Sequence, residues 1–86
     1  MNEIDVFKAL SDPTRLKILD LVKDQERCIC EIIPHTGKSQ PTISQHLSIL
    51  RNARLVKEYK EGTNVWISAA NNQIYSIINN IRGMTE

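Results

Sequence analysis

The chain is 86 residues long, 41% hydrophobic and 24% charged, with a formal net charge of +1. This composition is typical of one globular domain, which at this size often depends on a shared subunit interface for stability. The apolar runs are too short to span a membrane and no signal peptide opens the chain, so we expect a cytoplasmic protein without a membrane partner. Acidic residues outnumber basic ones in residues 1–37, and the reverse holds in residues 38–86. The second half is therefore the part that a polyanion would contact.

Two helices are predicted at the start of the chain. Ile4, Phe7 and Leu10 recur at helical spacing and predict an amphipathic helix over residues 2–10. The Asp-Pro pair at residues 12–13 is a typical start for a second helix. We expect this second helix to be the central core helix, because it carries a broad apolar stripe made of Leu16, Ile18, Leu19, Leu21 and Val22.

A helix-turn-helix is predicted over residues 28–53. The segment CICEIIPHTGK forms a short helix that Gly37 ends. After a tight turn, Ser39 supplies the N-cap oxygen of a second helix and Pro41 suits its first turn. The apolar face of this second helix consists of Ile43, Leu47 and Leu50. Its other face carries polar side chains that can contact base edges and phosphates in a major groove: Gln40, Thr42, Ser44, Gln45, His46 and Ser48.

A β-hairpin is predicted over residues 55–69. Residues 55–60 can form one strand and residues 64–69 the other, with Glu61, Gly62 and Thr63 at the tip. The side chains that alternate to one face of the second strand are Val65, Ile67 and Ala69. The predicted fold is mainly α with a small β-hairpin, in the order α-α-α-α-β-β-α. This is the order of a winged helix-turn-helix, here as a single domain over residues 1–86.

The last helix is predicted over residues 71–83. Its stripe of isoleucines at helical spacing consists of Ile74, Ile77, Ile78 and Ile81. Such a stripe is usually core, but a terminal helix beyond the hairpin has little of its own chain left to cover. We therefore expect a homodimer formed by this helix together with Ile4 and Phe7. A two-fold dimer would place two recognition helices roughly 34 Å apart and predicts an inverted-repeat operator in double-stranded DNA.

Three stretches of the chain, in this order and spacing, resemble the ArsR/SmtB family of small bacterial and archaeal repressors. They are ALSDPTRLKIL at residues 9–19, CICEI at 28–32 and SQPTISQHLSILRNARLVKEYKEGTNVWI at 39–67. The resemblance implies a homodimeric winged helix-turn-helix repressor, not an enzyme, that releases its operator when an inducer binds. By position it implies DNA contacts from the recognition helix (Ser39, Gln40, Thr42, Ser44, Gln45 and His46) and from the wing (Lys57, Lys60, Gly62 and Thr63).

His46 taken alone could be a metal ligand, a groove contact or an ordinary residue on a helix surface. Its place within SQHL favours a DNA contact over a metal ligand.

Cys28 and Cys30 are the only cysteines. In a cytosolic chain, a close pair indicates soft-metal or redox chemistry more often than a structural disulfide, and the other alternative is two buried small side chains. The family resemblance implies that both thiolates bind an inducer, which is arsenic(III), antimony(III) or a soft divalent ion such as cadmium or lead, with no obligatory cofactor. A trigonal ion would need a third donor from elsewhere. The last helix lacks the Asp and His ligands that family members use for zinc, cobalt or nickel.

The cysteine spacing also suggests how an inducer would act. Residues i and i+2 of a helix point about 200° apart, so we expect one ion to reach both sulfurs only if that turn unwinds. Pro34 weakens the same turn, because it has no N–H for the Cys30 carbonyl. Our hypothesis is that the ion distorts this helix, shifts the recognition helix and changes the half-site spacing.

Three alternatives stay open. The same fold could sense oxidants through a disulfide between the two cysteines. A small thiol-dependent reductase is disfavoured, because the chain has no phosphate-binding glycine loop and no CxxC motif. A winged helix that binds a protein in place of DNA would show salt-insensitive binding and no affinity for a duplex.

Overall fold

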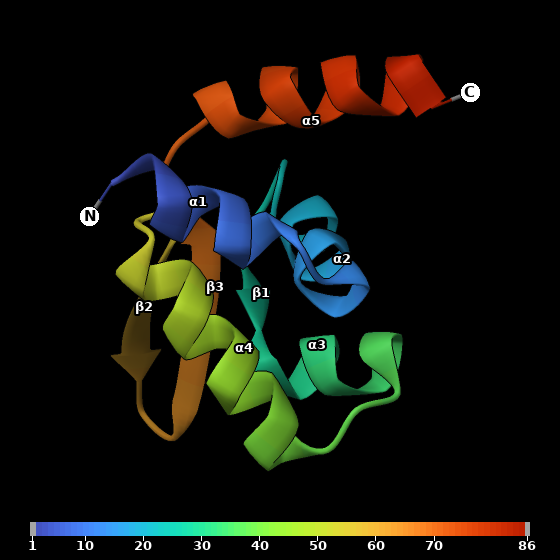
Figure 1. Cartoon of the computed structure of the whole chain (residues 1–86). Coiled ribbons are helices and arrows are strands. Elements are labelled where there is room, and N and C mark those ends of the chain that lie inside the picture. The colour runs from blue at the N-terminus through green and yellow to red at the C-terminus, as the bar shows by residue number, and fades with distance from the viewer. Residues whose placement is uncertain (1, 86) are drawn as a thin grey trace.

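The computed structural model describes residues 2–85 and confirms the mainly helical winged helix-turn-helix fold (Figure 1). Its elements are α1 (Glu3–Leu10), α2 (Pro13–Leu21), β1 (Arg27–Cys28), α3 (Ile29–Thr36), α4 (Gln40–Asn52), β2 (Val56–Glu61), β3 (Asn64–Ala69) and α5 (Gln73–Thr85). Helices α3 and α4 form the helix-turn-helix, and β2 and β3 form the wing. Figure 1 shows the α3–α4 turn and the tip of the wing at one end of the molecule and α5 at the other.

The helices begin and end where the local chemistry predicts. The Asp12 carboxylate accepts hydrogen bonds from the backbone N–H groups of Thr14 (2.8 Å) and Arg15 (3.2 Å), which caps α2. Gly37 ends α3 with a φ of +68°, a left-handed conformation that costs glycine little. Ser39 caps α4 by accepting from the Thr42 N–H.

The sheet has three strands, whereas the sequence predicted two. Strand β1 pairs antiparallel with β3, and the sheet order is β1-β3-β2. A strand of two residues has no periodicity of its own, and only its pairing with β3 defines it. The turn of the wing is also shorter than predicted, because Glu61 pairs with Asn64 and leaves only Gly62 and Thr63 between the strands.

One apolar core joins the helices to the sheet. Its fully buried large side chains come from α2 and its C-cap residue, from α3, α4 and β3, and from the turn after α4: Ile18, Leu19, Val22, Ile32, Ile43, Leu47, Leu50, Leu55 and Ile67. The predicted apolar face of α4 is thus buried. This packing fixes the opposite side of the helix toward solvent.

Helix α5 packs on α2, which divides its isoleucine stripe in a way we did not expect. Ile74 and Ile78 are 3% and 4% exposed and belong to the core of the chain, whereas Ile77 and Ile81 are 47% and 44% exposed. The Tyr75 hydroxyl donates to the Leu19 carbonyl (2.6 Å). The Arg82 guanidinium also pairs with both carboxylate oxygens of Asp20, at 3.1 and 2.9 Å. The prediction that Ile74 and Ile78 serve a subunit interface is therefore corrected: they serve the monomer.

Candidate DNA-binding surface and cysteine pair

The exposed face of α4 presents amide and hydroxyl groups over its first half. Gln40, Ser44 and Gln45 are exposed, and Ser48 is half-buried. The hydroxyls of Ser39 and Thr42 are hydrogen-bonded to each other (3.0 Å) while Ser39 also caps the helix, so both contribute to the start of α4 itself. Polar groups of this kind can donate to or accept from base edges and phosphates.

A groove separates α4 from the wing. The residues lining it are Ile29, Gln40, Ser44, Leu47, Ser48, Arg51, Glu58 and Val65. An ion pair between Arg51 and Glu58 crosses the groove and ties the recognition helix to β2. Arg51 also donates to the Ser48 hydroxyl (3.3 Å). Sequence reasoning missed Arg51, and its basic charge one helical turn beyond the polar face was the available signal.

The two wing lysines lie on opposite faces of the hairpin. Lys60 pairs with Val65 and Lys57 pairs with Ser68, and cross-strand partners share a face. Val65 lines the groove beside α4, so Lys60 lies on the same side of the wing as the recognition helix. Lys57 lies on the outer side. At the tip, Gly62 has a φ of +64°, which explains why glycine occupies the turn.

Tyr59 anchors the outer face of the wing and was also missed by the sequence reasoning. Its hydroxyl donates to Glu26 (2.8 Å), in the segment before β1. This hydrogen bond raises the pKa of Tyr59, so the phenol keeps its proton. No pattern in the sequence links residues so far apart.

His46 does not share the solvent-facing position of its polar neighbours. Its Nδ1 lies 3.0 Å from Arg15 Nη1, its Nε2 lies 3.8 Å from Asp12 Oδ2, and its side chain is only 15% exposed. Burial raises the pKa of Asp12, but the backbone N–H groups of Arg15 and Thr14 that donate to it, together with the neighbouring side chains of His46 and Arg15, lower it below its usual value. The geometry favours a contact between helices over the base contact that we predicted for His46.

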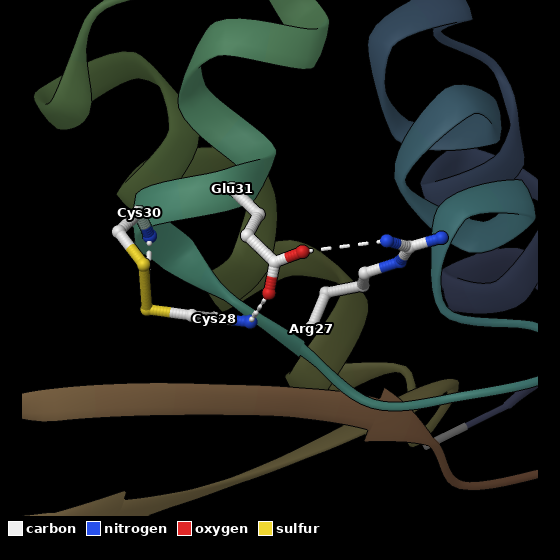
Figure 2. The surroundings of a disulfide bond; sticks show 4 residues. All are labelled: Arg27, Cys28, Cys30 and Glu31. Atoms are coloured by element: carbon white, nitrogen blue, oxygen red, sulfur yellow. Dashed lines mark hydrogen bonds and ion pairs between the residues drawn. A yellow bond between two sulfur atoms is a disulfide. The ribbon is translucent and has the colours of Figure 1, made fainter.

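The cysteine pair lies where β1 meets α3. Cys28 is the N-cap of α3 in an extended conformation, and Cys30 lies in the first turn. Their sulfurs form a disulfide with the Cα atoms 5.1 Å apart, as Figure 2 shows. Our premise that both cysteines lie within one helix is therefore wrong. Because Cys28 precedes the helix, the two sulfurs meet without any unwinding of α3.

The Glu31 carboxylate stabilises the turn that holds the two cysteines. Glu31 accepts from the Cys28 N–H (3.3 Å) with one oxygen and pairs with Arg27 (3.3 Å) with the other (Figure 2). Arg27 in turn donates to the Leu21 carbonyl (3.0 Å). This network fixes the start of α3 against the end of α2.

Beside the cysteine pair is a hollow of about 230 Å³, which we call the cysteine hollow. Its lining residues are Cys28, Ile29, Cys30, Ile33, Gln40, Thr63, Asn64 and Val65. Cys28 is buried and Cys30 is exposed. The hollow therefore touches the turn that holds the two cysteines, the first residue of α4 and the tip of the wing. Within residues 2–85, no third Cys, His, Asp or Glu joins the pair in a cluster fit to hold a metal ion.

Most of the exposed large apolar side chains lie on α1 and α5, and the others are Ile49 of α4 and Tyr59 of β2. Ile4 and Phe7 of α1 are 52% and 61% exposed, and α5 adds Ile77, Ile81 and Met84. None of the described helices has the length and apolar character needed to cross a bilayer.

Comparison with known proteins identifies the family. Residues 12–58 match the model of the bacterial regulatory protein arsR family. The chain is 40% identical over 75 residues to the transcriptional repressor SdpR of Bacillus subtilis, covering 87% of this chain and 83% of that protein. It is 38% identical over 76 residues to an arsenical resistance operon repressor of Staphylococcus aureus, covering 88% and 73%.

The fold is shared with a solved structure. A homodimeric winged helix-turn-helix DNA-binding domain from Mycobacterium bovis superposes with a TM-score of 0.83 at 30% identity, covering 95% of this chain and 76% of that one. The family consists of transcription regulators and not of enzymes. The chain is a DNA-binding transcriptional repressor that belongs to the arsR family.

Proposed function

We propose that this protein is a cytoplasmic homodimer that binds an inverted-repeat operator and releases it when Cys28 and Cys30 bind a thiophilic inducer. The inducer is arsenic(III), antimony(III) or a soft divalent ion such as cadmium or lead, because soft thiolate ligands select such ions. The observation that carries the proposal is the position of the cysteine pair, in one hollow with the tip of the wing and the start of α4. The S. aureus relative, named as an arsenical resistance repressor, supports the choice of arsenic.

Two subunits would associate through the exposed apolar residues of α1 and α5. Phe7, Ile77 and Ile81 leave water in that arrangement, and such burial favours association. The homodimeric structural relative supports this assembly. In each subunit Gln40, Ser44, Gln45 and Ser48 would face the major groove, and Lys60, Gly62 and Thr63 would contact the flanking backbone. Lys57 would contribute a weaker contact from the outer side of the wing.

The geometry suggests how the inducer would cause release of DNA. This route differs from the unwinding of α3 that the cysteine spacing implied. With the disulfide reduced, Cys28 and Cys30 would hold an ion at the mouth of the cysteine hollow, with a third donor from water or a small thiol. Gln40 and Thr63 line that hollow, so a ligand there would disturb the start of α4 and the tip of the wing together. The inducer must bind the DNA-free conformation more tightly, with a coupling of typically ~1–3 kcal/mol.

The second candidate is a repressor of the same fold that senses oxidants. The disulfide between Cys28 and Cys30 favours it, because the two sulfurs already lie within bonding reach. A peroxide would take two electrons and two protons from the thiols and leave as water and an alcohol, or as two waters. Such a protein would release DNA under peroxide in metal-free buffer, which separates the two candidates.

Fluorescence anisotropy on a labelled duplex from the region upstream of the gene tests the proposal. The reduced protein should bind tightly at low salt, and arsenite should reverse the binding. Cys28→Ser should bind the duplex as well as the wild type, because serine is a preferred N-cap residue, but should ignore arsenite. Release of the Cys28→Ser protein by arsenite would contradict the assignment of the inducer site, and no binding at low salt would contradict DNA recognition itself.

A further inference from the structure

Arg15 joins three helices through one guanidinium. Its Nε donates to the Ala9 carbonyl (2.8 Å) and its Nη2 to the Lys8 carbonyl (3.1 Å), both in the last turn of α1. Its Nη1 lies 3.0 Å from Nδ1 of His46, in the middle of α4. Arg15 itself belongs to the first turn of α2, which Asp12 caps. The side chain thus links the end of the proposed dimerisation helix to the recognition helix.

The contact with Arg15 determines which ring nitrogen carries the proton in the neutral His46 imidazole. An arginine guanidinium has only donors, so the Nδ1 atom facing it must be an acceptor. The neutral ring then carries its proton on Nε2, which points toward Asp12 (3.8 Å). His46 therefore accepts from a cation on one side and faces an anion on the other, and a proton on Nδ1 would break the bond to Arg15.

We propose that His46 is a positioning residue that sets the spacing of the two recognition helices in the dimer, acting through Arg15. The contact fixes the middle of α4 against the carbonyl end of α1. Because α1 carries the exposed Ile4 and Phe7 of the subunit interface, the angle between α1 and α4 determines where each recognition helix lies on DNA. This inference rests on the proposed DNA-binding dimer. It assigns to His46 a role in selecting the spacing between the two half-sites and no role in selecting a base.

Operator spacing is the direct test. A duplex is selected from a random-sequence library by the wild-type protein, and its two half-sites are then moved apart or together by one base pair, about 3.4 Å along the axis. The wild type should lose about tenfold in affinity on either shifted duplex, which corresponds to roughly 1.4 kcal/mol. His46→Ala should bind all three duplexes within about threefold of one another, with unchanged base preference within each half-site.

Three further variants, two single and one double, define the contact. The amide of His46→Gln can accept from Arg15 and donate toward Asp12, so this variant should restore the discrimination between spacings. Arg15→Lys, which lacks the planar fork, should lose it, and the double variant Arg15→Lys/His46→Ala should be no worse than either single one. By contrast, Gln45→Ala, on the exposed face of α4, should change base preference and keep the spacing discrimination.

The outcomes are distinct. A wild type that selects no duplex would contradict the proposed function as a whole. A wild type that selects one, together with His46→Ala that keeps the spacing preference and alters a base preference, would overturn the positioning role and establish a base contact. If His46→Ala fails to fold, the proposal is tested by the spacing preference of His46→Gln and by the long-range ¹H–¹⁵N spectrum of the wild-type imidazole. The inference requires Nε2–H with Nδ1 as acceptor, and the opposite tautomer would overturn it.

Discussion

Cys28 and Trp66 are cross-strand partners, one in β1 and the other in β3. On its other side Trp66 pairs with Tyr59 of β2, so the central strand connects the cysteine pair to the outer face of the wing. The indole Nε1 of Trp66 is buried and, among residues 2–85, has no hydrogen-bond partner. One cross-strand pairing therefore joins Cys28 to the wing.

Trp66 should report on the cysteine pair, because it is the only tryptophan. We expect its emission to change when the disulfide is reduced and again when arsenite is added. Cys28→Ser should remove both changes, since neither the disulfide nor the two-sulfur site can form. Steady-state fluorescence measures this, with Trp66→Phe as the matched blank. Identical arsenite titrations for wild type and Cys28→Ser would show that the ion binds elsewhere.

The wing lysines should contribute unequally to DNA binding. Lys60 lies on the side of the recognition helix, so Lys60→Ala should weaken binding and reduce the slope of log affinity against log salt by about 1. Lys57→Ala removes the same charge from the outer side and should change the slope less. Anisotropy titrations over a series of salt concentrations compare the two. Equal slopes would mean that both faces of the wing contact phosphates.

Ile77 should hold the subunits together, because it lies on the exposed apolar side of α5. We expect Ile77→Asp to yield a monomer in analytical ultracentrifugation and to lose affinity for the operator by on the order of 100-fold, since two linked half-site contacts become one. Asn79→Asp places the same charge on the exposed opposite side of the same helix and should stay dimeric. A dimeric Ile77→Asp protein would place the interface on another surface.

Tyr75 should make folding stability depend on alkaline pH. Burial, together with the negative charges of Asp20 and Asp24, raises the pKa of Tyr75 to about 12 from an ordinary value of 10.0. The stabilisation is complete below the unfolded pKa and is lost as pH rises from about 10 toward about 12. The free energy of unfolding of Tyr75→Phe should be about 1 kcal/mol lower than that of the wild type at neutral pH, because the hydrogen bond to the Leu19 carbonyl is lost. Urea titrations should show this difference shrinking above pH 10. A difference that is constant with pH would contradict the shifted pKa.

The sequence was sufficient where the signal is local. The Ser39 cap, the glycine that ends α3 and the apolar spacing of Ile43, Leu47 and Leu50 predicted the helix-turn-helix, because each depends on residues within a few positions. The alternation of Val65 and Ile67 predicted the inner face of the wing for the same reason.

Sequence reasoning failed where distant segments decide. Cys28 was predicted inside a helix, but its pairing with Trp66 draws it into a strand and makes it the N-cap. The spacing of the α5 isoleucines showed one stripe without showing that only Ile74 and Ile78 are buried in the core of the chain. His46 was predicted to contact DNA from its place within SQHL, and no local pattern indicated its neighbour Arg15, which is 31 positions away. Tertiary contacts of this kind leave no periodic signal.

The central claim is that the cysteine pair and the DNA-binding surface are coupled, and reciprocity offers its most direct test. Arsenite is titrated into the reduced protein, alone and saturated with its operator, with Trp66 emission as the signal. We expect DNA to weaken arsenite binding by the same factor by which arsenite weakens DNA binding. Equal arsenite affinities in the presence and absence of the operator would contradict it.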